Sequence, residues 1–286
     1  MSSTAGINTR SDVENETQDK AKPMEKTTSK VRMINFKAIY ILWLREMKTF
    51  WRAKSRILGS LLMPVFFLAF LGTGFAGAIL PGISVDITYL QFLVPGMVAM
   101  TVVFSSMFAG LSVLWDRQFG FLKEIMITPV TRVSIVMGRI AGGATTSLIQ
   151  GVAILLISTL LGFKISGILP FLVSILFMTL TAVAFIGLGL ALASKLKDMQ
   201  GFSLIMNFLI FPLLFLSGAI FPIDNMPSFV KALSYIDPMT YGVDGMRGAL
   251  LGVSSLPVAL SLVVILGTCV LMVFLGAYLF EKSESV

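Results

Sequence analysis

The composition of this 286-residue chain excludes an ordinary soluble protein, because hydrophobic residues make up 56% of it and charged residues only 13%. The net charge of +7 does not indicate a nucleic-acid partner, since the positive residues gather at the N-terminal end and in particular loops. The chain has no histidine, which excludes His-based catalysis and His-ligated metal sites, and its single cysteine, Cys269, excludes an intrachain disulfide.

The first 56 residues divide into a polar tail and an amphipathic stretch. Residues 1–35 have mixed charges and no apolar core, which predicts a disordered cytoplasmic tail and no secretory signal. In residues 36–56, apolar side chains recur at helical spacing. They are Phe36, Ile39, Tyr40, Trp43, Leu44, Met47, Phe50 and Trp51. Because Lys37, Arg45 and Lys48 fall on the other side, we expect an interfacial helix in the membrane plane, with a core-packed helix as the alternative.

Six apolar runs without acidic or basic residues follow, each long enough to cross a hydrocarbon core of roughly 30 Å. They cover residues 57–80, 90–114, 140–161, 171–194, 202–221 and 258–280. An all-α integral membrane domain over residues 57–282 is therefore predicted. One side of it carries 19 Lys and Arg residues and the other 3, so both termini are expected to be cytoplasmic.

Polar residues are a minority inside these runs. Gln150 and Asn207 are the best candidates for lining a pathway, since a buried amide needs partners. Small residues four apart, such as Gly138 with Gly142 and Gly189 with Ala193, favour the alternative that the polar residues serve helix packing.

The predicted cytoplasmic loop 116–139 combines charges with apolar residues. The candidate partner-coupling residues in it are Lys123, Glu124, Thr128, Pro129 and Arg132. Thr-Pro is typical of a helix start, which predicts two short helical pieces with a joint. We expect a docking surface for a cytoplasmic partner, because apolar side chains there would otherwise face water; a solvated connector is the alternative.

The last outer loop, residues 222–257, is too apolar for a solvated loop and too rich in Pro and Gly for a span. It is expected to pack back against the membrane. Asp224, Asp237 and Asp244 lack calcium-loop spacing, so we interpret them as caps and turn residues and predict no metal site.

Two absences restrict the source of energy. The chain contains no G-x-x-x-x-G-K-[ST] sequence, and the apolar runs hold no acid or base to carry protons. We therefore expect no enzyme activity in this chain, and energy for uphill transport has to come from another chain.

Two motifs resemble those of ABC type-2 exporter permeases, and most closely the daunorubicin-resistance type of drug-efflux permease. The outer-loop motif consists of Leu216-Ser217-Gly218-Ala219, Met226-Pro227, Asp237-Pro238-Met239-Thr240-Tyr241, Val243-Asp244 and Arg247. The cytoplasmic motif consists of Lys123-Glu124-Ile125 and Thr128-Pro129-Val130-Thr131-Arg132. The resemblance covers about residues 36–282, and Asp237 departs from it because the family more often has Asn there.

The resemblance implies a permease in a prokaryotic plasma membrane that exports a hydrophobic or amphiphilic substrate. It implies a second permease copy, usually an identical one, and a separate cytoplasmic ABC ATPase subunit that binds ATP and magnesium. The outer loop would form short re-entrant helices, with Pro222, Pro227, Pro238 and Tyr241 as its motif residues and Asp244 and Arg247 as a possible ion pair. Two alternatives stay open: export of a lipid-linked polysaccharide by the same machinery, and a membrane scaffold that transports nothing.

Overall fold

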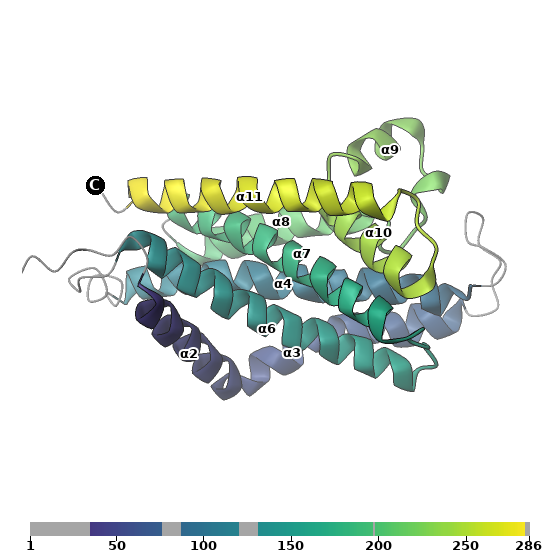
Figure 1. The fold of residues 1–286 in the computed structure, drawn as a ribbon, viewed down its shortest axis with the longest axis horizontal. Helices are drawn as coiled ribbons and strands as arrows, with labels where there is room; N and C mark the ends of the chain where they lie inside the picture. The colour runs from purple at the N-terminus through teal and green to yellow at the C-terminus, as the bar shows by residue number, and fades with distance from the viewer. Residues whose placement is uncertain (1–34, 76–86, 120–130, 197, 284–286) are drawn as a thin grey trace, which may run out of the picture. The chain divides into compact units, whose positions relative to one another are not determined.

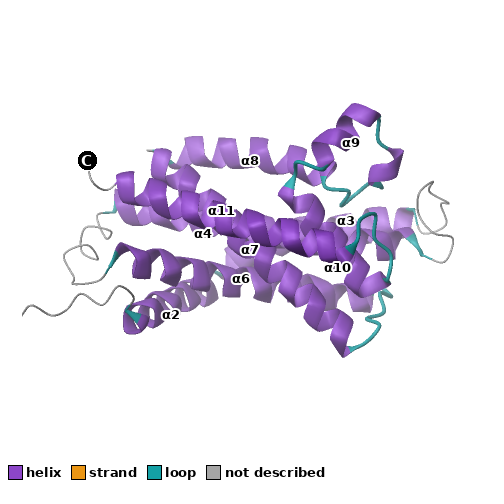
Figure 2. Ribbon diagram, turned by 45° about the horizontal axis from the view of Figure 1, so that its top comes forward, coloured by secondary structure: helices purple, strands orange, loops and turns teal. Residues whose placement is uncertain are grey.

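In a computed structural model, every regular element of the described residues, 35–75, 87–119, 131–196 and 198–283, is a helix (Figures 1 and 2). The elements are α2 (Phe36–Arg52), α3 (Lys54–Phe67), the π-helical turn η1 (Leu68–Gly72), α4 (Tyr89–Gln118), α6 (Arg132–Leu160), α7 (Ile168–Lys195), α8 (Met199–Leu216), the 3-10 turn η2 (Ile223–Asn225), α9 (Ser228–Ser234), α10 (Pro238–Leu251) and α11 (Val258–Ser283). The predicted N-terminal tail lies outside the described residues.

Five helices are long and apolar enough to cross a membrane: α4, α6, α7, α8 and α11. A sixth span is obtained if α2 and the helix after it, Ile57–Gly72, count as one span bent by 68°. The prediction of an all-helical membrane protein with short helices between spans is thus confirmed. Among the five long helices, two boundaries differ most from the expected ones: α6 begins at Arg132, well before residue 140, and α8 ends at Leu216 instead of residue 221.

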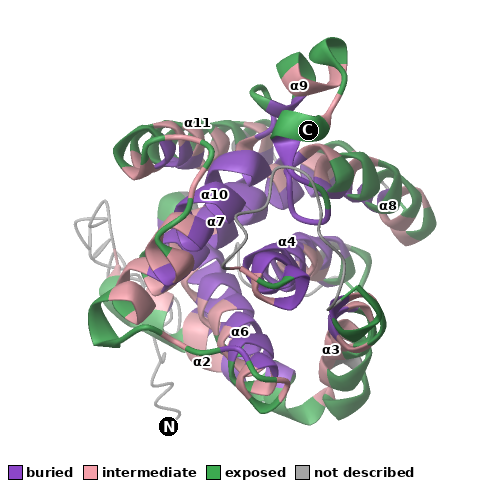
Figure 3. Ribbon diagram, turned by 90° about the vertical axis from the view of Figure 1, so that its right-hand side faces the viewer, coloured by how far each residue is buried: buried purple, intermediate pink, exposed green. Residues whose placement is uncertain are grey.

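The spans differ in how much of their surface other helices cover. In α4, 78% of the apolar window is buried, compared with 22% in α8 and 17% in α11. Figure 3 shows the same contrast, with α4, α7 and α10 largely buried and α3, α8 and α11 largely exposed. α4 and α7 therefore form the centre of the bundle, while α8 and α11 present apolar side chains outward.

Small residues bring the central helices close together. A Cβ added to Gly110 of α4 would lie 2.5 Å from the backbone of Gly189 in α7, and one added to Gly276 of α11 would lie 2.6 Å from the carbonyl oxygen of Gly187. Both faces of α7 thus accept a neighbouring helix at backbone distance, as small residues permit in membrane bundles.

α2 lies along the outside of α6 (Figure 1). Leu42 and Glu46 pack over Gly138 and Gly142, where an added Cβ would come within 2.8 Å of their side chains. The indole Nε1 of Trp43 donates a hydrogen bond to Thr145 Oγ1 at 3.0 Å. α2 is therefore attached to α6 through a face that includes Leu42 and Glu46 and shares only part of the expected apolar face.

The expected apolar face of α2 is only partly used in this packing. Phe36, Tyr40 and Trp51 stay exposed, whereas Met47 and Phe50 are buried. The helix also ends earlier than the predicted range 36–56, because Ala53 leaves the helical conformation and α3 begins at Lys54. α2 thus packs on the bundle with one face and exposes aromatic side chains on another.

Candidate functional site

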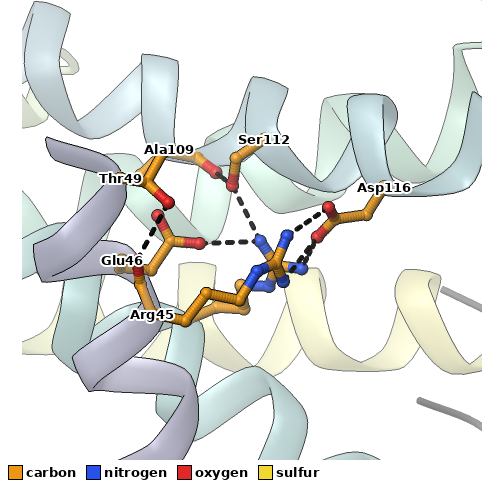
Figure 4. A network of polar contacts seen from close by, with 7 residues as sticks. Arg45, Glu46, Thr49, Ala109, Ser112 and Asp116 are labelled. Atoms are coloured by element: carbon orange, nitrogen blue, oxygen red, sulfur yellow. Dashed lines mark hydrogen bonds and ion pairs between the residues drawn. The ribbon is translucent and has the colours of Figure 1, made fainter. Parts of the chain in front are cut away.

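Four charged side chains from three helices form a buried network (Figure 4). Arg139 of α6 donates through Nη1 to Glu46 Oε1 of α2 at 2.8 Å and to Ser112 Oγ of α4 at 2.9 Å, and through Nη2 to Asp116 of α4. Arg45 of α2 binds the same Asp116 carboxylate with both terminal nitrogens. The two arginines and two carboxylates neutralise each other, with Arg139 (3% exposed) and Asp116 (9%) away from water and Arg45 (33%) partly exposed.

From the sequence these charges are expected in other roles. Arg45 lies on the polar face of the predicted interfacial helix, and Asp116 and Arg139 are the ends of the predicted cytoplasmic loop 116–139. The sequence signal that could have identified Arg139 as a charge at a helix interface is its position between Gly138 and Gly142, the two residues on which α2 packs. A charge next to a small-residue contact lies at a helix–helix interface and requires a partner from the other helix.

The outer-loop motif builds the start of α10. Asp237 is its N-cap, with Oδ1 accepting from the backbone N–H of Met239 at 2.8 Å, and Pro238 occupies the first helical position. The hydroxyl of Tyr241 donates to the carbonyl oxygen of Tyr235 at 2.7 Å, which ties α10 to the end of α9. Burial raises the pKa of Asp237 from 3.8 to about 8, only partly opposed by the bond from Met239.

Pro222 and Pro227 each occupy the position before a short helix, η2 and α9 respectively. The prolines of the motif thus mark the starts of η2, α9 and α10, the short helices expected in this loop, which lie beside the ends of α8 and α11 (Figure 2).

Asp244 and Arg247 do not form the expected ion pair in the described structure. Arg247 Nη2 donates to the carbonyl oxygen of Gly218 at 2.8 Å and to that of Phe92 at 3.3 Å, and its guanidinium carbon lies 3.8 Å from the centroid of the Phe92 ring. Burial lowers the pKa of Arg247 to about 10, so the side chain remains charged at neutral pH.

The Asp244 carboxylate binds the connection between α10 and α11. It accepts from the backbone N–H of Ser255 at 2.7 Å, from that of Leu256 at 3.1 Å and from the hydroxyl of Ser261 at 3.4 Å. The pairing prediction was wrong because backbone groups satisfy the two charges separately: the carbonyl oxygens of Gly218 and Phe92 for Arg247, and the N–H groups of Ser255 and Leu256, which precede α11, for Asp244.

An apolar cavity of about 410 Å³ lies between α3, α4 and α8. It is lined by Gly59, Ser60, Met63 and Pro64 of α3, Met100, Phe104 and Phe108 of α4, and Phe211 of α8. The rings of Phe104 and Phe211 meet edge to face, with centroids 6.2 Å apart. A cavity of this size and lining suits an apolar molecule of drug-like dimensions.

A small polar recess adjoins this cavity, since Ser60 and Phe108 line both. The recess measures about 20 Å³, and its polar wall consists of Glu46, Ser60, Ser105, Ser112, Thr146 and Gln150. Ser60 Oγ donates to Gln150 Oε1 at 2.8 Å and so connects α3 to α6 beside the recess.

The predicted pathway residues separate in the structure. Gln150 is buried against the recess, whereas Asn207 is exposed on α8 and is not among the residues that line the cavity. Of the predicted coupling residues, Lys123, Glu124, Thr128 and Pro129 lie outside the described residues, and Arg132 is the first residue of α6.

Comparisons with known proteins match most of the chain. Residues 37–251 match the model of the family described as ABC-2 type transporter. The chain is 28% identical over 224 residues to the putative transport permease ycf38 of Cyanophora paradoxa, covering 78% of this chain and 77% of that protein. It is 28% identical over 215 residues to nodulation protein J of Rhizobium leguminosarum bv. viciae, which covers 74% of this chain and 79% of that protein. It is also 28% identical over 244 residues to the inner membrane transport permease YadH of Escherichia coli K12, which covers 84% of this chain and 91% of that protein.

Proposed function

This chain belongs to the ABC-2 type transporter family, and on that premise we propose that it exports hydrophobic or amphiphilic molecules, drug-like or lipid-like, from the cytoplasm or the inner leaflet. The family assignment makes it the multi-pass permease component of an ABC-2 transporter, which works with a nucleotide-binding partner. The export direction, the substrate class and membership of the daunorubicin-resistance subgroup are parts of the proposal.

The observation that carries this proposal is the apolar cavity between α3, α4 and α8. Its aromatic and methionine side chains offer adaptable contacts to molecules of differing shape. α3 and α8, which form two of its walls, are among the least covered helices of the bundle. A second copy of the permease placed against this side would enclose the cavity between two subunits, and we include such a homodimer in the proposal.

The attachment of α2 suggests how ATP hydrolysis by the partner reaches the cavity. In the proposal, ATP and magnesium bind the partner, which contacts α2 and the 116–139 loop on the cytoplasmic side, with both termini on that side. A displacement of α2 would be transmitted to α4 through Asp116 and to α6 through Arg139. Such a change has to rest on different affinities of ATP for the two states of the partner.

The proposal is tested by purifying the tagged permease from membranes with its ATPase. We expect an ATPase subunit to co-purify with the wild type and to be lost with Glu124→Lys or Pro129→Ala, while Asp224→Asn in the outer segment serves as the matched control. The reconstituted pair should show ATP-dependent movement of a fluorescent amphiphile.

Two other results would replace this function. Movement of a lipid-linked polysaccharide without any amphiphile transport would identify a glycan exporter. Absence of any co-purifying ATPase, together with absence of transport, would leave a membrane scaffold.

A further inference from the structure

Behind the apolar cavity, the polar recess presents hydrogen-bonding groups that the described residues do not fully satisfy. Among the described residues, the Glu46 carboxylate has one hydrogen-bond partner, Arg139, which it binds through Oε1. Gln150 is 5% exposed and Ser105 7% exposed, yet neither the Gln150 amide nitrogen nor the Ser105 hydroxyl has a hydrogen-bond partner among the described residues. The three groups face one small space, and polar groups in such a place need hydrogen-bond partners, so the recess requires a polar occupant.

The volume of the recess limits which polar molecule can occupy it in this conformation. A space of about 20 Å³ holds a single water molecule, which needs two to four polar partners, and the recess offers that many. The much larger apolar cavity begins at the shared residues Ser60 and Phe108. A molecule with an apolar body and a small polar head therefore matches the two spaces together, with the head displacing the water.

The chemistry of the wall selects the head group. An ionised carboxylate accepts hydrogen bonds and donates none, so a group beside Glu46 has to be a donor. Glu46 is the only charged residue among the described residues that line the recess, and its ion-pair partner Arg139 is not among them. The recess therefore meets the negative end of the Glu46–Arg139 pair, which favours an ammonium head group over a carboxylate.

We propose that the cavity and the recess form one binding site for cationic amphiphiles, in which the body lies against Phe104, Phe108 and Phe211 and the ammonium head donates hydrogen bonds to the Glu46 carboxylate and the Gln150 amide oxygen. This proposal rests on the proposed export function and adds the substrate class. The head group enters when the Ser60–Gln150 hydrogen bond opens, because this bond joins α3 to α6 at the border between the two spaces.

Two fluorescent probes with the same reporter and opposite head charges test the proposal. Dansyl-1,5-diaminopentane carries an ammonium group and 6-(dansylamino)hexanoic acid a carboxylate on a chain of similar length. Binding is measured by fluorescence titration of the full-length permease alone in phosphatidylcholine nanodiscs, whose lipid has no net charge. We expect the ammonium probe to bind about tenfold more tightly than the carboxylate probe, as one partly screened charge contact gives.

Variants with opposite charge changes separate head recognition from folding. Glu46→Gln should bring the affinity ratio of the two probes close to one. Gln150→Glu, which keeps an acceptor for Ser60 and adds a negative charge, should raise that ratio by several-fold. If Glu46→Gln does not fold, this variant alone shows whether negative charge in the recess sets the preference for the ammonium probe. Phe104→Ala should weaken both probes equally, and Asp224→Asn, far along the chain in the outer segment, should leave both affinities unchanged.

A wild-type protein that binds neither probe, or that binds both equally, would overturn the proposal, and so would a ratio unaffected by both charge variants. Because the ATPase partner is absent from the titration, this result is independent of transport. A charge-selective site in a permease that moves no substrate would contradict the export function and leave the binding site standing.

Discussion

The protein buries charge in two regions and stabilises it in two different ways. Where α2, α4 and α6 meet, Arg45, Glu46, Asp116 and Arg139 bind one another, and each ion has its opposite within the network. In α10, by contrast, Arg247 binds two backbone carbonyl oxygens and an aromatic ring, and Asp244 binds two backbone N–H groups and a hydroxyl. One region thus connects side chains with side chains, and the other connects side chains with the backbone.

This difference separates movable contacts from fixed ones. Long side chains that bind one another can exchange partners when helices shift, so a network of this kind is compatible with a displacement of α2. Backbone groups are held by their own segments, so Arg247 and Asp244 fix the chain around α10 in one arrangement. The cytoplasmic attachment we propose for α2 requires the first property.

Removal of Arg139 tests the network most severely. Arg139→Leu leaves Glu46 without its partner and Asp116 with one arginine fewer in a buried place, so the free energy of unfolding should fall by about 3–5 kcal/mol. The measurement is unfolding of the purified permease in detergent. In a double-mutant cycle, Asp116→Asn should restore part of the loss; strictly additive effects of the two changes would contradict a coupled network.

Arg247→Leu removes hydrogen bonds from a charged donor to Phe92 and Gly218, and we expect a loss of about 2–3 kcal/mol. Exchange of the two charges, with Asp244→Arg and Arg247→Asp in one chain, should be no more stable than either single change, because the two residues have separate partners. Recovery of stability in the exchanged protein would show that Asp244 and Arg247 interact with each other. The α10 charges would then be stabilised by side-chain pairing, as in the network of Arg45, Glu46, Asp116 and Arg139.

Asp237 provides a test that depends on pH. Its folded-state pKa of about 8 exceeds the ordinary value of 3.8, because burial disfavours the charged carboxylate. Between these two values the folded protein holds a proton that the unfolded chain has released, so its contribution to stability decreases as the pH rises from about 4 and is fully lost above about 8.

Asp237→Asn keeps the acceptor for the Met239 N–H and cannot ionise, so its effect should be small at neutral pH. Compared with the wild type, its unfolding temperature should decrease less between pH 6 and pH 9. Parallel pH profiles of the two proteins would refute a protonated Asp237.

The exposed ion pair between Lys231 and Asp224, 2.6 Å apart, gives the smallest expected effect. Solvent screens such pairs, and ordering two exposed side chains offsets most of the attraction. Lys231→Ala should leave the unfolding temperature unchanged within error. A clear decrease would mean that exposed charges of the outer segment stabilise it as the buried ones do.

The elements of the fold could be predicted largely from the sequence, because uninterrupted apolar runs leave few options for a chain in a bilayer. The role of Gly138 and Gly142 as a helix contact was predicted as well, since small residues at this spacing allow close approach. The helix starts at Pro222, Pro227 and Pro238 follow from the fixed φ of proline, although their arrangement around α10 does not.

The partners of the charges could not be predicted, for physical reasons that particular residues illustrate. Arg45 and Asp116 are 71 positions apart, and their contact depends on how α2 crosses the bundle. Asp244 and Arg247 lie three positions apart on one helix, and this local proximity suggested a pair. Backbone groups at the ends of neighbouring segments compete for such charges, and a residue pattern does not reveal where those groups lie.

The contacts of Asp244 have a consequence for the order in which the protein is assembled during synthesis. Its partners Ser255, Leu256 and Ser261 follow it by only 11 to 17 positions, whereas the contact of Arg247 with Phe92 spans 155. Contacts between near positions close quickly because little loop entropy is lost. The turn from α10 into α11 should therefore form as soon as Ser261 has left the ribosome. This turn would then be complete before α10 packs against α4.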